Sequence, residues 1–113
     1  LEKLVSTKEI IIFGSGKLGE FAPVLLQLNG INTIKAYCDN NSALWGKKLQ
    51  GKLILSPKEA VRTYPQALYL VANKLHRQEI KQQLVNMGVA TNNICDYTFG
   101  VDPMFLNKVF LNK

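Results

Sequence analysis

The stretch that most constrains the fold is an apolar run that ends in a glycine-rich turn, Ile10-Ile11-Ile12-Phe13-Gly14-Ser15-Gly16-Lys17-Leu18-Gly19. Four apolar residues without alternation predict a strand that is covered on both faces, and such strands belong to parallel sheets. The spacing Gly14-x-Gly16-x-x-Gly19 matches the dinucleotide-binding fingerprint. It also follows a predicted strand and opens a predicted helix, which is the context that this fingerprint requires.

Each glycine of such a loop has its own physical role. The first permits a sharp turn, the second lets backbone amides approach phosphate oxygens, and the third lets the helix pack tightly on the strand. The helix start offers unpaired amides and a partial positive charge, to which Lys17 could add a full charge. A Walker-type loop is excluded, because it needs four residues between its first glycine and Gly-Lys. The alternative interpretation is a tight strand–helix turn that holds no ligand.

Strands and helices alternate along the rest of the chain. The expected elements are a helix at 18–28 kinked at Pro23, strands at 33–38 and 53–55, a helix from a Ser56 cap to about Thr63, a strand at 67–72, a helix starting soon after Asn73, and a weak strand at 94–95. This alternation predicts parallel strands with helices on both faces, and right-handed crossovers favour the sheet order 3-2-1-4-5. The predicted fold is α/β, a Rossmann-like three-layer sandwich with a mostly parallel sheet of about five strands. Its ligand crevice should lie outside the carboxyl ends of strands 1 and 4.

Further polar residues should gather at that edge. Asp39 lies 20 residues past Gly19, at the end of the second strand, where an acid can accept hydrogen bonds from ribose hydroxyls and disfavours a 2′-phosphate. Alternatively, Asp39 forms an Asx turn before Asn40. Asn73 follows the fourth strand and could bind ligand or cap the next helix. The candidate binding residues are therefore Gly14, Ser15, Gly16, Lys17, Leu18, Gly19, Asp39, Asn40, Asn73 and Lys74.

Other residues carry weaker signals. Lys47, Lys48 and Lys52 could join Lys17 in a basic rim suited to a diphosphate, or be simply solvated. Trp45 could stack on a base or sugar, or anchor its loop. His76, the single histidine, lies in the first turn of a predicted helix and lacks a paired nucleophile or carboxylate. Because no catalytic residue or metal-ligand cluster stands out, the chain has the character of a binding unit.

The net charge and the two cysteines indicate which class of ligand and which redox compartment to expect. The net charge of +6 favours an anionic ligand. Nucleic acid is not expected, because the lysines are scattered and no basic-aromatic interleaving occurs. No apolar run approaches the roughly 20 residues that span a bilayer. Cys38 and Cys95 should lie on strands separated by two others, too far apart for a disulfide, so we expect free thiols of a reducing, cytoplasmic compartment.

The length is that of one domain, here residues 1–113 with a core at 9–95 and a tail at 96–113. The sequence has no initiator Met, and its end from Met104 to Leu111 is very apolar. These features predict a fragment of a longer polypeptide, or a tail that packs on a partner or a second copy. The alternative is a short terminal helix docked on its own domain.

Several motifs together carry a family resemblance. The glycine loop is followed by Cys38-Asp39-Asn40-Asn41, Trp45-Gly46-x-x-Leu49-x-Gly51-x-x-Ile54, Ser56-Pro57-x-Glu59, Leu70-Val71-Ala72 and Glu79-Ile80-x-x-Gln83-Leu84-x-x-x-Gly88-Val89. Over about residues 9–94, this pattern resembles the small Rossmann-like domain of bacterial surface-polysaccharide and sugar-modifying enzymes. That domain occurs at the front of sialic-acid-type sugar O-acyltransferases, ahead of the catalytic part in nucleotide-sugar dehydratases, and near the end of some sugar methyltransferases.

The resemblance implies that Gly14, Ser15, Gly16, Lys17 and Asp39 contact a nucleotide-sugar. The acyltransferase relatives take their acetyl donor and catalytic histidine from a β-helix of hexapeptide repeats, which this sequence lacks, and His76 does not match that histidine. We therefore expect a non-catalytic, nucleotide- or nucleotide-sugar-binding domain. UDP-sugar is the favoured ligand. NAD and coenzyme A are possible ligands too, because each carries a diphosphate that could bind the same glycine loop. The alternatives are an NAD(H)-dependent oxidoreductase or epimerase-type domain, and a docking module with an empty site.

Overall fold

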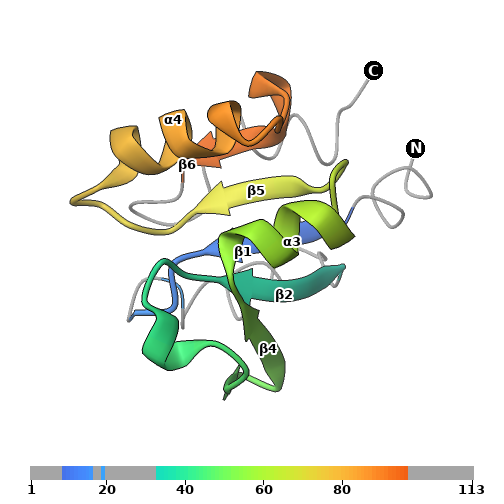
Figure 1. The fold of residues 1–113 in the computed structure, drawn as a ribbon, viewed down its shortest axis with the longest axis vertical. Coiled ribbons are helices and arrows are strands. Elements are labelled where there is room, and N and C mark those ends of the chain that lie inside the picture. Colours follow the sequence, from blue (N-terminus) through green and yellow to red (C-terminus); the bar gives the residue numbers. More distant parts are fainter. Residues whose placement is uncertain (1–8, 17–18, 20–32, 97–113) are drawn as a thin grey trace.

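A computed structural model describes residues 9–16, 19 and 33–96 (Figure 1). Its elements, in chain order, are β1 (Ile10–Phe13), β2 (Ile34–Cys38), the 3-10 helix η1 (Ser42–Leu44), β3 (Lys48–Leu49), β4 (Lys52–Leu55), α3 (Pro57–Thr63), β5 (Leu68–Val71), α4 (Arg77–Asn86), the 3-10 helix η2 (Thr91–Asn93) and β6 (Ile94–Asp96). The predicted helix at 18–28, its kink at Pro23, the residues Lys17 and Leu18, and the apolar tail lie outside the described residues.

The strands form one sheet in the order β3-β4-β2-β1-β5-β6. Without β3, this is the predicted order 3-2-1-4-5, and the β1–β2, β1–β5, β2–β4 and β5–β6 pairs are all parallel. The Rossmann-like α/β fold is therefore confirmed. From β1, the chain first adds β2 and β4 on one side and then β5 and β6 on the other. The switch point of the topology therefore lies at the carboxyl ends of β1 and β5.

The two-residue strand β3 was not predicted. It pairs antiparallel with β4 through a tight turn at Gln50 and Gly51, both of which have positive φ, 52° and 74°. Such a turn joins the two strands of a hairpin. Two residues, one of them lysine, are too few to show a strand pattern in the sequence.

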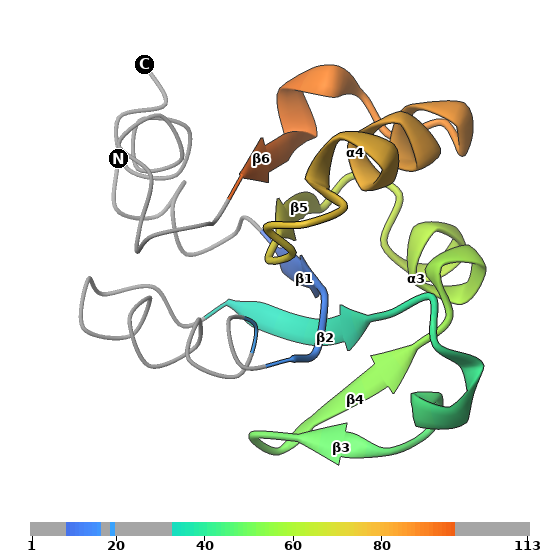
Figure 2. The same cartoon turned by 90° about the vertical axis from the view of Figure 1, so that its left-hand side faces the viewer.

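The two central strands are buried on both faces, as their continuous apolar runs predict. No residue of β1 or β5 is more than 1% exposed. On one face, Ile11 and Phe13 share a core cluster with Ala60 of α3 and Leu84 of α4, and both helices lie on that side of the sheet (Figure 2). Ile10, Ile12 and Leu70 alternate to the opposite face and are equally buried.

Helix α3 begins as its sequence predicts. The Ser56 hydroxyl accepts a hydrogen bond from the Glu59 amide at 3.0 Å, Pro57 occupies the first turn, and the helix ends at Thr63. Helix α4 begins at Arg77 rather than soon after Asn73, so His76 precedes the helix instead of lying in its first turn. Among the described residues, no helix is long and apolar enough to cross a membrane.

The close packing around β1 predicts unequal effects of adding a methyl group at the loop glycines. In Gly14→Ala, the new Cβ would lie 2.7 Å from the Ala72 carbonyl oxygen at a residue with a φ of 115°. We expect the free energy of unfolding to fall by about 2–4 kcal/mol. Gly16→Ala is the matched control, because its Cβ would meet nothing within 4 Å, and its stability should stay within about 0.5 kcal/mol of wild type. Urea unfolding followed by circular dichroism measures both, and equal midpoints for the two variants would contradict the packing argument.

Candidate functional site

The first glycine holds the turn at the end of β1 against two neighbouring strands. Its amide donates to the Cys38 carbonyl of β2 at 2.8 Å. Its positive φ and its contact with the Ala72 backbone leave no room for a side chain. Gly14 therefore has the role that the fingerprint assigns to the first glycine, a sharp turn under close backbone approach.

The second and third glycines differ sharply in their surroundings. A Cβ on Gly19 would lie 2.0 Å from the Gly14 carbonyl oxygen, and the Gly19 carbonyl accepts the buried Tyr37 hydroxyl at 2.9 Å. Gly16 is exposed, and the space beside its α-carbon is open. Gly19 thus permits close backbone packing, whereas Gly16 leaves the backbone accessible to a ligand.

Asp39 fastens the loop to the end of β2. One carboxylate oxygen, Oδ2, accepts the Ser15 amide at 3.0 Å and the Ser15 hydroxyl at 2.8 Å. The other, Oδ1, accepts the Asn41 amide at 2.9 Å, which is the Asx turn left open by the sequence. The amides of Gly14 and Ser15 are therefore already bonded within the fold, whereas the predicted start of the first helix lies mostly outside the described residues. Of the loop amides that the structure describes, that of Gly16 has no partner among the described residues.

Trp45 lies over the backbone of the same acidic residue. Its indole N–H donates to the Asp39 carbonyl at 2.6 Å, while the residue as a whole stays 45% exposed. The bond anchors the η1 loop beside the carboxyl end of β2. Since Trp45 is the single tryptophan, its fluorescence reports on this corner of the molecule.

A pocket of about 320 Å³ opens at the switch point, between the carboxyl ends of β1, β2 and β5 and the first two turns of α4. It is lined by Phe13, Gly14, Asp39, Asn40, Asn73, His76, Glu79, Ile80 and Gln83. The Asn73 side chain accepts the His76 amide at 2.9 Å, and His76 Nδ1 lies 3.2 Å from a Glu79 carboxylate oxygen. Of the candidate binding residues, the structure thus brings Gly14, Asp39, Asn40 and Asn73 together around one pocket.

The α4 contribution to the pocket was missed by the sequence analysis. Glu79, Ile80 and Gln83 recur at helical spacing after His76, so one face of the helix follows the pocket wall. Gln83 and Asn40 also make a reciprocal pair of hydrogen bonds, of 3.0 and 2.9 Å, between their side-chain amides. The periodicity was a usable signal, but only the fold shows which end of the sheet this helix covers.

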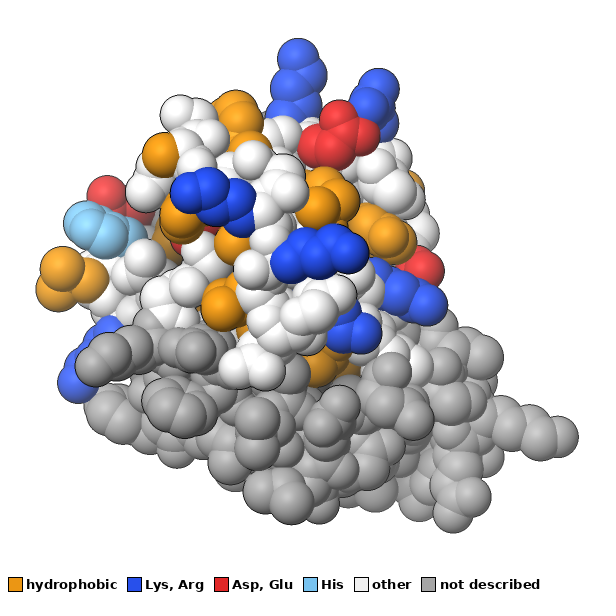
Figure 3. All heavy atoms as spheres, turned by 90° about the horizontal axis from the view of Figure 1, so that it is seen from below, with side chains coloured by type: hydrophobic (Ala, Val, Ile, Leu, Met, Phe, Trp, Pro, Cys, Tyr) orange, Lys and Arg blue, Asp and Glu red, His pale blue; other side chains and the backbone are white. Residues whose placement is uncertain are grey.

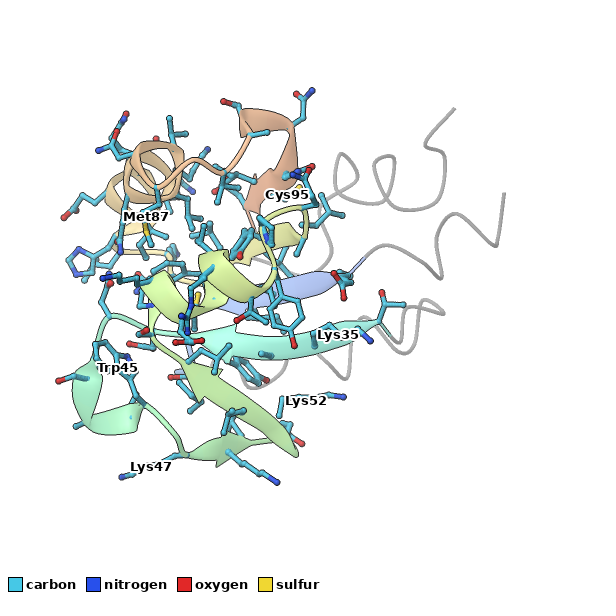
Figure 4. The ribbon with its side chains drawn as sticks, turned by 45° about the vertical axis from the view of Figure 1, so that its right-hand side comes forward. Lys35, Trp45, Lys47, Lys52, Met87 and Cys95 are labelled. Carbon is cyan, nitrogen blue, oxygen red and sulfur yellow. The ribbon has the colours of Figure 1, made fainter. Side chains whose placement is uncertain are left out.

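Of the lysines that could form a basic rim, Lys47, Lys48 and Lys52 do not line this pocket, and Lys17 lies outside the described residues. The candidate binding residue Lys74 is also absent from the lining. Lys52 begins β4, so it lies at the amino edge of the sheet, near Lys35 and far from Trp45 (Figure 4). Figure 3 shows lysine and arginine side chains scattered over one face rather than gathered in a patch. The described pocket instead carries the carboxylates Asp39 and Glu79.

The two cysteines lie on strands that two other strands separate, as the sequence predicts. Cys38 lies on β2 and Cys95 on β6, with β1 and β5 between them; both are buried, and the two are not joined in a disulfide. Burial, and secondly the Asp39 charge, raise the pKa of the Cys38 thiol well above 9.0. Among the described residues, no three His, Cys, Asp or Glu side chains are grouped so that they could hold a metal ion.

Fold and loop together define a Rossmann-like domain with a glycine turn at its switch point. Within this class, the chain belongs to the family described as C2185-like, N-terminal, whose family model matches residues 6–95. A search of curated proteins gave no match.

Solved structures share the fold at low sequence identity. UDP-D-quinovosamine 4-dehydrogenase from Vibrio fischeri is 19% identical with a TM-score of 0.60, over 73% of each chain. RSP, a Rex-family repressor, is 19% identical with a TM-score of 0.63, over 97% of this chain and 61% of that one. RSP in complex with β-NAD+ and operator DNA is 18% identical with a TM-score of 0.61, over 84% of this chain and 52% of that one. The chain thus spans little more than half of the repressor, and at these identities the likeness shows the fold alone.

The Asp39 carboxylate should hold the loop in place even without ligand. Asp39→Ala removes three hydrogen-bond acceptor contacts, and we expect a loss of about 1–3 kcal/mol in the free energy of unfolding. Ser15→Ala removes only the hydroxyl contact and should cost about 0.5–1.5 kcal/mol. Urea unfolding measures the stability, and Trp45 fluorescence of the folded variants reports the local change. An Asp39→Ala variant as stable as Ser15→Ala would argue against this role.

The buried thiol predicts a loss of stability in alkali. Because the folded-state pKa of Cys38 is raised, the folded thiol keeps its proton where the unfolded thiol, with an ordinary pKa of 9.0, loses it. Unfolding then releases a proton, so stability is unaffected below pH 9 and falls as pH rises above it, by up to about 1.4 kcal/mol per pH unit. The measurement is the difference in unfolding free energy between wild type and Cys38→Ala from pH 7 to 10.5. A difference that stays constant across this range would contradict the assignment.

Proposed function

We propose that this chain is a nucleotide- or nucleotide-sugar-binding domain of a bacterial carbohydrate-modifying enzyme, which holds the ligand phosphates at the loop of residues 14–19. The observation that carries the proposal is the exposed Gly16, with open space at its α-carbon, in the turn after β1. The Asp39 carboxylate, at the carboxyl end of β2, bonds to the neighbouring Ser15. No described atom lies within 4 Å of the position of a Cβ on Gly16, so the described residues leave the backbone open to an anion on that side. Lys17 would supply a positive charge beside it.

Asp39 is suited to the ribose of such a ligand. A carboxylate offers about four lone-pair sites, and the described contacts use two on Oδ2 and one on Oδ1. A ribose hydroxyl can donate to the remaining site, and its own oxygen can compete for Ser15. A 2′-phosphate would be repelled, so the proposed ligand has a free 2′-hydroxyl.

The carbohydrate part of the proposal has a separate basis. The motif order resembles the small domains of sugar-modifying enzymes, and one structure with this fold is a dehydrogenase named for a UDP-sugar. We therefore rank UDP-sugars first among the ligands. Cys38 and Cys95 are buried and are not joined in a disulfide, which favours a reducing compartment such as the bacterial cytoplasm.

The second candidate function is NAD binding in an oxidoreductase or epimerase-type domain. Its support is the repressor with this fold, solved with β-NADH and with β-NAD+. A complete dinucleotide site usually uses both halves of a doubly wound sheet. The described sheet continues only through β5 and β6 beyond β1, and for this reason NAD ranks below UDP-sugars. A docking module that binds nothing, joined to a partner through residues 104–111, is the remaining alternative.

Calorimetric titration of the 113-residue chain with UDP-glucose, NAD+ and coenzyme A tests the proposal. We expect UDP-glucose to bind most tightly, and Gly16→Val to weaken its binding at least tenfold, because the new side chain fills the phosphate approach while meeting no neighbour within 4 Å at its Cβ. Gln66→Val, on the exposed turn before β5, is the control and should bind as wild type does. Tightest binding of NAD+ would promote the second candidate. Three flat titrations, with a dimer seen by light scattering, would favour the docking module.

A further inference from the structure

We propose that the side-chain amides of Asn40 and Gln83 read the hydrogen-bonding edge of a nucleobase. The inference rests on the proposed function and names the part of the ligand that enters the pocket. The two residues are 43 positions apart, on the turn after β2 and in the second turn of α4. Both line the pocket, and they join its two sides.

The order of groups along the edge matches the order of groups in a nucleotide. The open backbone at Gly16 would take the phosphate, and Asp39 would take the ribose. Ser15 links these two positions directly, through its amide and hydroxyl bonds to the Asp39 carboxylate. Asn40 is the next residue and faces the pocket. The group attached to the ribose on the side away from the phosphate is the base.

The charge and size of the pocket exclude the other parts of the ligand. Its described lining holds the carboxylates of Asp39 and Glu79 and contains no lysine or arginine. A phosphate would be repelled there, whereas a neutral base would not. The volume of about 320 Å³ is at the small end of the 300–1,000 Å³ typical of ligand pockets. It suits one flat ring system rather than a whole nucleotide-sugar.

The amide pair has the chemistry of a base edge. Asn40 Nδ2 donates to Gln83 Oε1 at 3.0 Å, and Gln83 Nε2 donates to Asn40 Oδ1 at 2.9 Å. Each amide thus presents a donor beside an acceptor. Adenine and uracil carry the same arrangement, and Asn or Gln pairs with adenine through two hydrogen bonds in other settings. A base that takes the place of one amide makes the same two hydrogen bonds to the other. Because the pair is exposed, the displaced amide can then bond to water or to a further group of the base.

Three monophosphates that differ only at the base test this inference. The 113-residue chain is titrated with UMP, AMP and ribose 5-phosphate, and dissociation constants are read from NMR chemical shifts. We expect wild type to bind at least one nucleotide about tenfold more tightly than ribose 5-phosphate. Gln83→Met keeps the length of the side chain and removes the amide, and it should abolish this tenfold preference while leaving ribose 5-phosphate binding unchanged. Whether UMP or AMP shows the preference identifies the base.

The matched control is Gln82→Met, on the same helix. Gln82 bonds to Asn86 at 3.0 Å and does not line this pocket, so its loss should leave the preference intact. Asn40→Ala is a second test variant, with folding of all variants checked by their urea midpoints. An unchanged preference in Gln83→Met, or equal weakening of ribose 5-phosphate, would show that the pair only ties β2 to α4 and overturn the inference. Equal binding of all three ligands by wild type would also overturn it while leaving the phosphate site standing, whereas no binding of any of them would remove the proposed function as well.

Discussion

The constraint on which the site depends is the close approach of backbone to backbone at the end of β1. Gly14 donates to Cys38 of β2 and lies against the Ala72 carbonyl after β5, at a φ that favours glycine. Gly19 in turn lies against the Gly14 carbonyl. Because three strand ends meet here without intervening side chains, the following turn is held at the switch point of the sheet. Every other feature of the candidate site is positioned relative to that turn.

Asp39 fixes the loops around this turn before any ligand binds. Its carboxylate holds Ser15 and Asn41, and its carbonyl holds the Trp45 indole, so one residue fixes the glycine loop and the η1 loop together. Preorganisation of this kind lowers the cost of ordering loops when a ligand binds. It also limits the anion site, since the Ser15 amide is already used and the open backbone lies at Gly16. The described pocket is acidic, so charge separates the phosphate end of the proposed ligand from the end that enters the pocket.

Local patterns predicted most of the architecture for reasons that lie in short-range physics. A strand such as β1, buried on both faces, needs a continuous apolar run, and the Ser56-Pro57 start of α3 satisfies helix amides within one turn. The β3–β4 hairpin was missed because its strand of two residues carries no periodic signal. The position of Lys52 was not predicted, for a different reason. Closeness in sequence placed Lys52 near the site, whereas the direction of β4 puts it at the opposite edge of the sheet.

The sequence by itself determined the fold class, the strand order, the glycine turn and the acidic residue beside it, because each depends on residue type and spacing within one strand–turn unit. Only the tertiary structure decided which helix face closes the pocket, that Asp39 occupies the Ser15 amide, and that Gln83 meets Asn40. These contacts join segments 24 to 43 residues apart. Their partners are chosen by how the crossovers stack helices on the sheet, and no local pattern encodes that choice.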